Sequence, residues 1–237
     1  MPMAGRGTRF ANSEALPKPL IQLDGKPFFW WAVESVRRLG PVDEMVFVVL
    51  DEHVRQFAID QRIREYYPSA RIERLAQVTA GAADTAAAGI ASLRSVGPVA
   101  ICDSDLAFDL GEGDVRLALA DRDGLLLCFE SHDPAYSFAC VDAAGEVRAT
   151  VEKRAVSDCA IAGCYLFASP QTYLDAQATY RLGCAYDEAF ISGVYNTLIG
   201  TGGRVGRLML RRHLSFGTPA EFASVTADPT RLDLWAA

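Results

Sequence analysis

The sequence predicts an α/β fold built around a mainly parallel central sheet. Strand-like and helix-like runs alternate through the first half of the chain, a pattern typical of parallel strands joined by crossover helices. No repeat, low-complexity tract or long linker divides the 237 residues, and half of them are hydrophobic. A chain of this length and composition can bury a core without a disulfide or a structural metal. We therefore expect residues 1–237 to form a single domain.

The first half alternates between the two kinds of element. Pro27 stands at the expected first position of a helix that Gly40 closes. The apolar patterns after it predict a strand at 44–50, a helix at 53–66, a strand at 71–75, a helix at 84–95 and a strand at 98–105. The last strand runs into acidic residues. Because open α/β sheets bind ligands beyond the carboxyl ends of their strands, we expect a ligand site there.

The second half is richer in strands. Four strand-like runs follow one another at 124–131, 136–142, 146–153 and 158–167, with a hairpin loop at 142–145. Helices from about Pro170 and at 191–199, and a strand at 205–210, complete the prediction. We expect this mixed region to form the far side of the same ligand site.

Charge and cysteine content narrow the classes of function. The chain carries 23 basic and 30 acidic residues, a formal charge of −7, which opposes the phosphate contacts on which nucleic-acid binding depends. No apolar run approaches the length of a bilayer span, and the start lacks the features of a secretory signal. We expect a cytoplasmic protein with no nucleic-acid or membrane partner. The six cysteines lack zinc or CxxC spacing, which favours reduced, structural roles.

The opening segment, MAGRGTRF followed by LPKPL, contains the strongest sign of chemistry. Gly5 and Gly7 permit a tight turn whose N–H groups can surround an anion. Arg9 supplies a guanidinium suited to phosphate oxygens, and Lys18 supplies a compact positive charge. The loop lacks the GK[ST] ending of a P-loop, which disfavours a Walker-type ATPase. The simpler alternative is a turn whose cations only face solvent.

Two carboxylates, Asp103 and Asp105, follow the apolar run VAIC at the end of a predicted strand. Their spacing lets both reach one hard cation that prefers oxygen ligands. In an arbitrary protein such a pair is often only a solvated loop. Next to a phosphate-binding loop, it predicts a magnesium site.

These motifs together resemble the signature of the sugar-nucleotidyltransferase family, the sugar-1-phosphate nucleotide pyrophosphorylases and their cytidylyltransferase relatives. The resemblance continues through QVTAG (77–81), ICDSDLAF (101–108), Glu152-Lys153, AGCY (162–165) and SFGTP (215–219). It implies a Rossmann-like α/β/α sandwich, similar to the GT-A fold. It also implies Mg²⁺-dependent transfer of an NMP from an NTP to a phosphorylated small molecule, first of all a sugar 1-phosphate, with release of pyrophosphate.

The resemblance also implies a role for each matching residue. Catalysis would involve Arg9, Lys18, Asp105 and Lys153; the nucleotide would be bound by Ala4, Gly5, Gly7, Thr8, Gln77 and Gly81; the acceptor by Glu152, Lys153 and Gly163; and Mg²⁺ by Asp105, with Asp103 beside it. From the residues alone, Glu152-Lys153 is equally well an exposed ion pair, and Gly163 a bulge in its strand. The segment from Tyr186 to Ser192 loosely resembles one that lines the acceptor site; a plain helix start is the alternative. The sequence is compatible with a monomer or with a homo-oligomer.

Two features depart from the family pattern. Only Met1 to Met3 precede the first loop, so we expect a short first strand or a true start further upstream. Ser215 stands where many relatives have an aspartate that acts as a second metal ligand, which favours a weaker metal site.

Two other functions therefore stay open. A GT-A glycosyltransferase also places an Asp-x-Asp pair at a strand end, but it would release NDP from a nucleotide sugar. A non-catalytic sensor would bind a nucleotide or a sugar phosphate without turnover.

Overall fold

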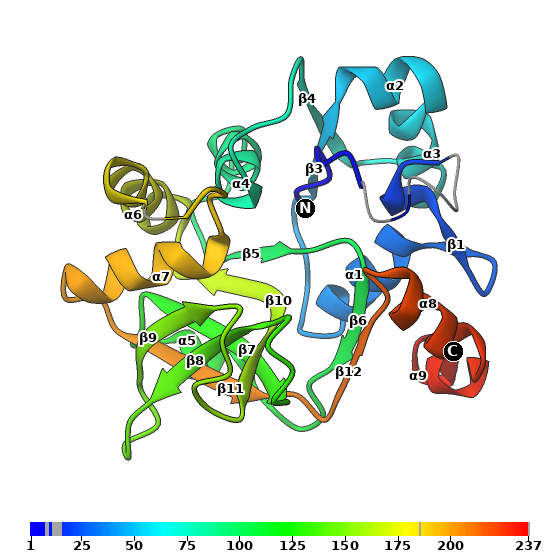
Figure 1. The fold of residues 1–237 in the computed structure, drawn as a ribbon. Coiled ribbons are helices and arrows are strands. Elements are labelled where there is room, and N and C mark those ends of the chain that lie inside the picture. Colours follow the sequence, from blue (N-terminus) through cyan, green and yellow to red (C-terminus); the bar gives the residue numbers. More distant parts are fainter. Residues whose placement is uncertain (8–9, 11–15, 185, 237) are drawn as a thin grey trace.

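The computed structural model describes residues 1–237 except 8–9, 11–15, 185 and 237. It confirms the α/β fold and the α/β/α layering (Figure 1). The helices are α1 (Phe28–Arg37), α2 (Asp51–Phe57), α3 (Ile59–Tyr66), α4 (Ala82–Ala91), α5 (Val115–Leu119), α6 (Pro170–Gly183), α7 (Ile191–Gly200), α8 (Pro219–Thr226) and α9 (Asp233–Ala236). The strands are β1 (Gln22–Leu23), β2 (Lys26–Pro27), β3 (Val46–Leu50), β4 (Arg71–Leu75), β5 (Val99–Cys102), β6 (Leu106–Asp109), β7 (Gly124–Glu130), β8 (Ser137–Val141), β9 (Val147–Glu152), β10 (Cys159–Phe167), β11 (Val205–Met209) and β12 (Arg212–Ser215).

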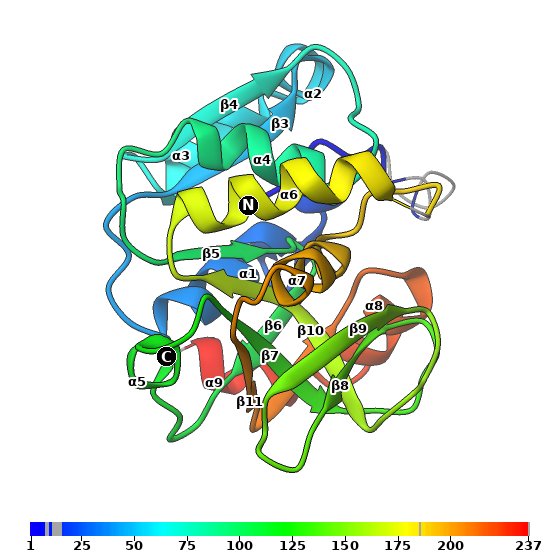
Figure 2. The ribbon, with the colours of Figure 1, turned by 90° about the vertical axis from the view of Figure 1, so that its left-hand side faces the viewer.

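The largest sheet has the order β11-β7-β10-β8-β9, and β5 also pairs with β10. Helices α4, α6 and α7 lie over one face of it, and α1 and α5 lie on the other (Figure 2). Strand β7 shows how the sequence sets this arrangement, because alternate side chains of a strand point to opposite faces. Leu126 and Cys128 pack with the first group of helices, whereas Leu125 and Leu127 pack with the second.

The expectation of a mainly parallel sheet is corrected. The pairs β3–β4 and β11–β7 are parallel, but β10 runs antiparallel to β5, β7 and β8, and β8 runs antiparallel to β9. The reason lies in the connections of the second half. Short loops such as the turn at 142–145 can join only antiparallel neighbours, since a parallel pair needs a long crossover.

Element boundaries differ from the predictions in several places, among them the three that follow. The helix expected at 53–66 is two helices, α2 and α3, separated by Ala58 in the left-handed conformation (φ 50°). Neither glycine nor proline marks that break in the sequence. Pro27 ends β2 rather than opening α1. The strand expected at 98–105 ends at Cys102, which leaves Asp103 and Asp105 in the turn before β6.

The first strand is short, as expected. It is reduced to a parallel bridge between Pro2 and Val48, with hydrogen bonds from Met3 N to Val48 O (2.8 Å) and from Val48 N to Met1 O (3.0 Å). These bonds place the glycine-containing loop directly beyond β3. Among the described residues, no helix combines the length and apolar character that crossing a bilayer requires.

Candidate active site

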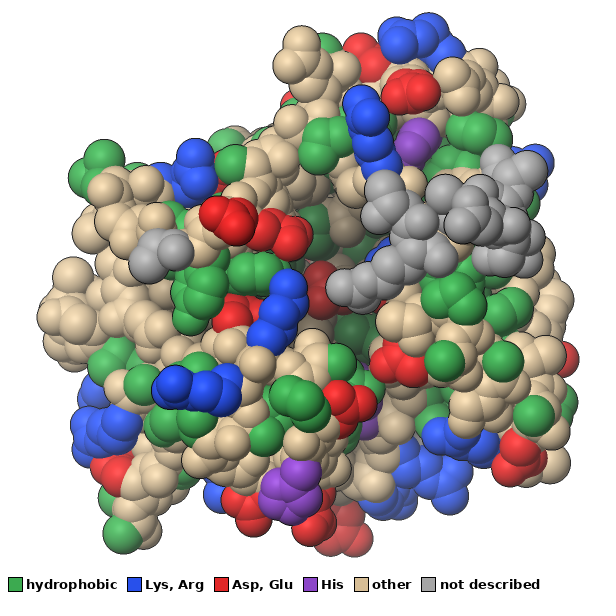
Figure 3. Space-filling view, viewed as in Figure 1, with side chains coloured by type: hydrophobic (Ala, Val, Ile, Leu, Met, Phe, Trp, Pro, Cys, Tyr) green, Lys and Arg blue, Asp and Glu red, His purple; other side chains and the backbone are tan. Residues whose placement is uncertain are grey.

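A cavity of about 990 Å³ opens on the face drawn in Figure 3, with acidic and basic side chains around it. Two groups of segments line it, and Asp103 to Leu106 lie between them. We call them the glycine-loop side (residues 2–7, 18–19, 78–82 and 85) and the strand side (residues 134–137, 152–153, 161–163, 165, 187–188, 190–191, 213, 215, 217–218 and 221). The two sides come from opposite halves of the chain.

The glycine loop lies where the sequence predicts. Ala4, Gly5 and Gly7 line the cavity, and Gly7 has φ +60°, a conformation that favours glycine. A side chain at Gly7 would also press on Lys18, because its Cβ would lie 3.1 Å from Lys18 Cβ. The expected nucleotide and phosphate ligands Thr8 and Arg9 lie outside the described residues.

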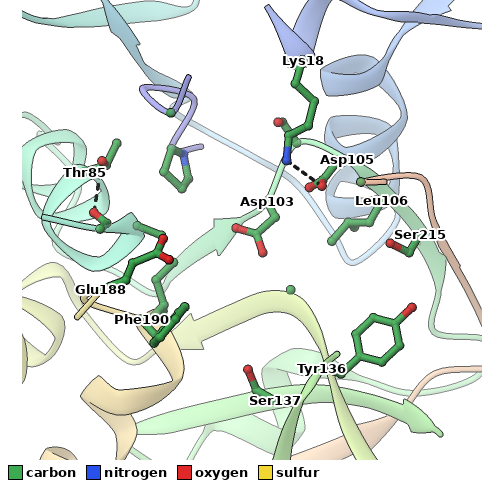
Figure 4. Close-up of a pocket in the computed structure, with 18 of the residues that line it drawn as sticks. Lys18, Thr85, Asp103, Asp105, Leu106, Tyr136, Ser137, Glu188, Phe190 and Ser215 are labelled. Atoms are coloured by element: carbon green, nitrogen blue, oxygen red, sulfur yellow. Dashed lines mark hydrogen bonds and ion pairs between the residues drawn. The ribbon is translucent and has the colours of Figure 1, made fainter. Parts of the chain in front are cut away.

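Lys18 and Asp105 form an ion pair at the centre of the cavity, with 2.8 Å between Nζ and Oδ2 (Figure 4). The Asp105 carboxylate also lies against Gly217, where a Cβ would be 2.0 Å from Oδ2. Only glycine leaves room for the carboxylate there. Two segments far apart in the sequence thus fix the position of Asp105.

Asp103 lies beside Asp105 and points into the cavity (Figure 4). Its amide donates to the carbonyl of Gly163 at 2.9 Å. Burial, followed by the nearby charge of Asp105, raises the pKa of Asp103 to about 7. A divalent cation between the two carboxylates would remove this repulsion and favour the charged forms.

The donor set fits Mg²⁺. Asp103 and Asp105 line the same cavity and carry oxygen ligands, and no group of three or more His, Cys, Asp or Glu suited to a metal occurs among the described residues. Mg²⁺ is commonly bound by one or two carboxylates and completes its shell with water and substrate phosphates. Ser215, on β12, pairs with Leu106 in the adjacent strand β6. It therefore lies near Asp105 and offers a hydroxyl where the family pattern has a carboxylate.

The start of α4 completes the glycine-loop side. Gly81 precedes the helix and touches the backbone of Ala189, since a Cβ on it would lie 2.5 Å from that residue's N and O atoms. Thr79 and Thr85 bond to each other through their hydroxyls at 2.7 Å. Gln77, expected to read the base, is exposed and is not among the residues that line the cavity. The structure therefore does not bring Gln77 to the site.

On the strand side, Glu152 and Lys153 both line the cavity at the end of β9. The hydroxyls of Ser137 and Ser192 each donate to Oε1 of Glu152. Lys153 has φ +50°, and its Nζ lies 4.8 Å from the centre of the Phe190 ring. Glu152-Lys153 is therefore not the simple exposed ion pair that was the alternative.

Gly163 both bulges its strand and lines the cavity. The register between β10 and β7 shifts between Ile161 and Tyr165, and Gly163 has φ +71°. A Cβ there would lie 2.8 Å from Asp103 Oδ2 and 2.7 Å from Leu106 Cδ2. The bulge is confirmed, and it makes room for the Asp103 carboxylate, whereas contact of Gly163 with an acceptor stays a prediction.

Several lining residues were not singled out by the sequence as cavity residues. Tyr136 donates to Glu221 Oε1 at 3.1 Å, across 85 residues of sequence. His213 stacks on Phe129, with ring centres 3.9 Å apart, and burial lowers the pKa of His213 to about 4. No local motif in the sequence predicts these contacts, because they depend on the pairing of β12 with β6 and on the capping of α8.

The loosely matched segment before α7 also reaches the site. Asp187, Glu188 and Phe190 line the cavity, while α7 begins immediately afterwards at Ile191. The segment is therefore both a helix start and part of the cavity wall.

Two curated proteins are similar to this chain in sequence. The bifunctional protein GlmU of Campylobacter curvus is 29% identical over 170 residues, covering 69% of this chain and 37% of GlmU. The 2-C-methyl-D-erythritol 4-phosphate cytidylyltransferase of Chromobacterium violaceum is 34% identical over 95 residues, covering 39% of this chain and 38% of that enzyme. The matches thus span less than two-fifths of either relative. No family model matches the sequence.

The fold has close counterparts among solved structures. The nucleoside-diphosphate-sugar pyrophosphorylase of Vibrio cholerae RC9 superposes with a TM-score of 0.84, covering 96% of this chain and 98% of that one at 22% identity. Together with the two sequence relatives, this likeness confirms the resemblance to the sugar-nucleotidyltransferase family and the predicted fold.

Proposed function

We propose that this protein is a Mg²⁺-dependent nucleotidyltransferase that transfers an NMP from an NTP to a phosphorylated small molecule and releases pyrophosphate. Sugar 1-phosphates are the first acceptor class to test. One observation carries the proposal: a single cavity brings together the glycine loop, the pair of Lys18 and Asp105, and the end of β9 at Glu152 and Lys153. These are the parts that joining two phosphorylated substrates requires.

Each side of the cavity would take one substrate. Backbone N–H groups near Ala4 and Gly5, together with Lys18 and Arg9, would bind the triphosphate on the glycine-loop side. Gly81, which also lines this side of the cavity, would lie beside the base. Lys153 would hold the acceptor phosphate on the strand side, directed at the α-phosphorus for in-line attack.

Asp105 and Asp103 would hold Mg²⁺, which when bound supplies positive charge against the negative charge that develops on the phosphates. Lys18 neutralises Asp105 in the present structure. On nucleotide binding, we propose that Lys18 exchanges this carboxylate for a phosphate oxygen, so that Asp105 becomes free to act as a ligand. The site then keeps its charges paired both before and after substrate binding.

We further propose that residues 1–237 act as one nucleotidyltransferase domain in the cytoplasm, with an NTP and a phosphorylated acceptor as partners and no nucleic acid. The negative formal charge supports the last point.

A screen of pyrophosphate release tests the function. The four NTPs are combined with phosphorylated sugars, polyols and amino alcohols in the presence of Mg²⁺. Pyrophosphate that appears only when NTP and acceptor are both present supports the proposal. A glycosyltransferase would instead release NDP from a nucleotide sugar, and a sensor would bind a nucleotide without turnover.

A further inference from the structure

Cys128 and Cys159 lie together in the core of the largest sheet, outside the candidate active site. Cys128 is opposite Ile161 in the pairing of β7 with β10, and Cys159 lies two residues before Ile161. Because residues two apart on a strand point to the same face, the two cysteines are diagonal neighbours. Both belong to one buried cluster, and their thiols make a hydrogen bond with each other. Neither cysteine lines the cavity of the candidate active site.

Arg207 brings a positive charge to the same face of the sheet. It is opposite Leu126 in the parallel pair β11–β7, and Leu126 belongs to the same buried cluster as the two cysteines. The Nε atom of Arg207 is buried without a hydrogen-bond partner, and its guanidinium makes no ion pair with a carboxylate in the described part of the chain. A partly buried cation without a counter-charge is costly. An ionised thiol beside Arg207 would supply that counter-charge.

The contacts of Cys159 favour its ionised form. A hydrogen bond from the Cys128 thiol, opposed by burial and aided by the charge of Arg207, lowers the pKa of Cys159 to about 7; Asp158 acts in the opposite direction. The same hydrogen bond raises the pKa of Cys128. Cys159 is therefore the nucleophile of the pair, whereas Cys128 keeps a proton that it can donate.

Cys159 also lies closer to the surface than Cys128. It is the first residue of β10, directly after the exposed residue Asp158, and it keeps 7% of its surface exposed, against none for Cys128. Its Sγ contacts Sδ of Met209 at 3.7 Å, and Met209 is 40% exposed. A small oxidant therefore meets Cys159 before it meets Cys128.

We propose that Cys159 is a peroxide-sensitive thiol that forms a disulfide with Cys128. The Cys159 sulfur attacks one oxygen of hydrogen peroxide, so that an S–O bond forms and the O–O bond breaks. The other oxygen leaves with the Cys159 proton as water, and a sulfenic acid remains. The Cys128 sulfur then attacks the Cys159 sulfur; the S–S bond forms, the S–O bond breaks, and the hydroxyl leaves with the Cys128 proton as water. In all, two thiols are oxidised to a disulfide, and hydrogen peroxide is reduced to water.

Site-resolved mass spectrometry of the full chain tests this proposal. The reduced protein is treated with hydrogen peroxide near neutral pH, the remaining thiols are blocked, and the protein is digested with trypsin without reduction. We expect peptides 123–148 and 155–181 to become joined, and dithiothreitol to separate them again. Because each peptide holds a second cysteine, Cys140 and Cys164 respectively, fragmentation must assign the bond to Cys128 and Cys159.

Cysteine variants separate the two steps. Cys159→Ser should prevent the bond and leave Cys128 reduced. Cys128→Ala should instead let a sulfenic acid accumulate at Cys159, where dimedone captures it. Cys140→Ser, at a partly exposed position outside the buried cluster, should leave both steps unchanged and also simplifies the assignment of the bond.

Arg207 should act through Cys159 as a positioning residue. Arg207→Gln should slow oxidation of Cys159 roughly tenfold near neutral pH, as expected if the thiol pKa rises by about one unit. The pH at which the rate is half-maximal should rise as well, which a merely structural effect would not cause. Arg207→Lys, which keeps the charge, should restore most of the rate. Arg154→Gln, at an exposed position outside the buried cluster, should leave the rate unchanged.

Three results would overturn the proposal. The first is faster oxidation of Cys140 or Cys184, the two partly exposed cysteines, than of Cys159. The second is that peptides 123–148 and 155–181 never become joined through Cys128 and Cys159. The third is a disulfide that forms only where circular dichroism shows the protein to be unfolded. The experiment needs neither NTP nor acceptor, so its result does not depend on the proposed function.

Discussion

The glycine-loop side of the cavity presents backbone groups and the cations Arg6 and Lys18, whereas the strand side presents four carboxylates and Lys153. The first surface suits a ligand with many negative charges and few distinguishing side groups. The second suits a ligand that must be told apart from others by its polar groups. Under the proposed function, the nucleotide would be bound mainly through its phosphates, and selection among acceptors would depend on side chains from the second half of the chain.

Asp105 lies between the two sides, so its loss should have the largest effect. Asp105→Asn should lower kcat by about a thousandfold or more, equivalent to about 4 kcal/mol, because it removes a charge that would hold the metal. Pyrophosphate release at saturating Mg²⁺ measures this. Asp43→Asn, at an exposed position, is the matched control. Wild-type turnover in the Asp105 variant would exclude it as a metal ligand.

Substitutions of Lys153 and Lys18 test directly whether each side of the cavity binds a different substrate. Lys153→Ala should raise the acceptor KM and lower kcat, together by roughly 10–100-fold in kcat/KM, the value of a hydrogen bond to a charged group. The affinity for NTP should change little. Lys18→Ala should instead weaken binding of the NTP. Calorimetric titration with each substrate shows which lysine serves which side, and the reverse pattern would refute the division.

A neutral His213 adds no positive charge to the strand side of the cavity. The pH dependence of the unfolding free energy reports whether the ring is neutral. Because the folded-state pKa of His213 is about 4, below the ordinary value of 6.5, the unfolded chain takes up a proton that the folded chain does not. His213 should therefore lower the free energy of unfolding as pH falls from 6.5 through 4, by about 3 kcal/mol in all. His213→Gln should remove this part of the pH dependence of the unfolding free energy, and His132→Gln, at an exposed position, should not. Identical pH profiles for His213→Gln and the wild type would contradict a ring that stays neutral in the folded protein.

A substitution at Ser215 should change Mg²⁺ binding, and this is the smallest effect that we predict. A hydroxyl is a poorer Mg²⁺ ligand than a carboxylate, so the wild type should bind Mg²⁺ detectably only with NTP present. Ser215→Asp should strengthen nucleotide-free binding by roughly tenfold, about 1.4 kcal/mol. Its effect on rate depends on how strongly the added charge repels the triphosphate. Metal titrations with and without a non-hydrolysable NTP, with Ser95→Asp as an exposed control, measure the change. Tight nucleotide-free binding in the wild type would mean that another carboxylate serves the metal.

The glycine-loop side was the easier side to predict. Gly5, Gly7 and Lys18 occur in one short motif, and their chemistry follows from backbone freedom and charge. Asp103 and Asp105 follow a recognisable buried strand. Gln77 shows the limit of prediction from a motif, because a motif match does not say whether a side chain points toward the cavity or toward solvent.

The strand side was predictable only where adjacent residues carry the motif, as at Glu152 and Lys153. The contact of Tyr136 with Glu221 depends on how a turn before β8 and the start of α8 meet. The stacking of His213 on Phe129 depends on strand register. Such contacts between segments 80 or more residues apart follow from tertiary packing, which a local pattern does not specify. The antiparallel course of β10 escaped prediction for the same reason.

The central claim is that the cavity joins the α-phosphorus of an NTP to the phosphate of an acceptor. An NTP labelled at its α-phosphorus is incubated with Mg²⁺ and the best acceptor from the pyrophosphate screen, with Asp105→Asn as the control. The account predicts that the label moves into a new diphosphate-linked product in step with pyrophosphate, and that both depend on the acceptor and on Asp105. Label that stays in the NTP, or that appears as free NMP or NDP whether or not the acceptor is present, would contradict it.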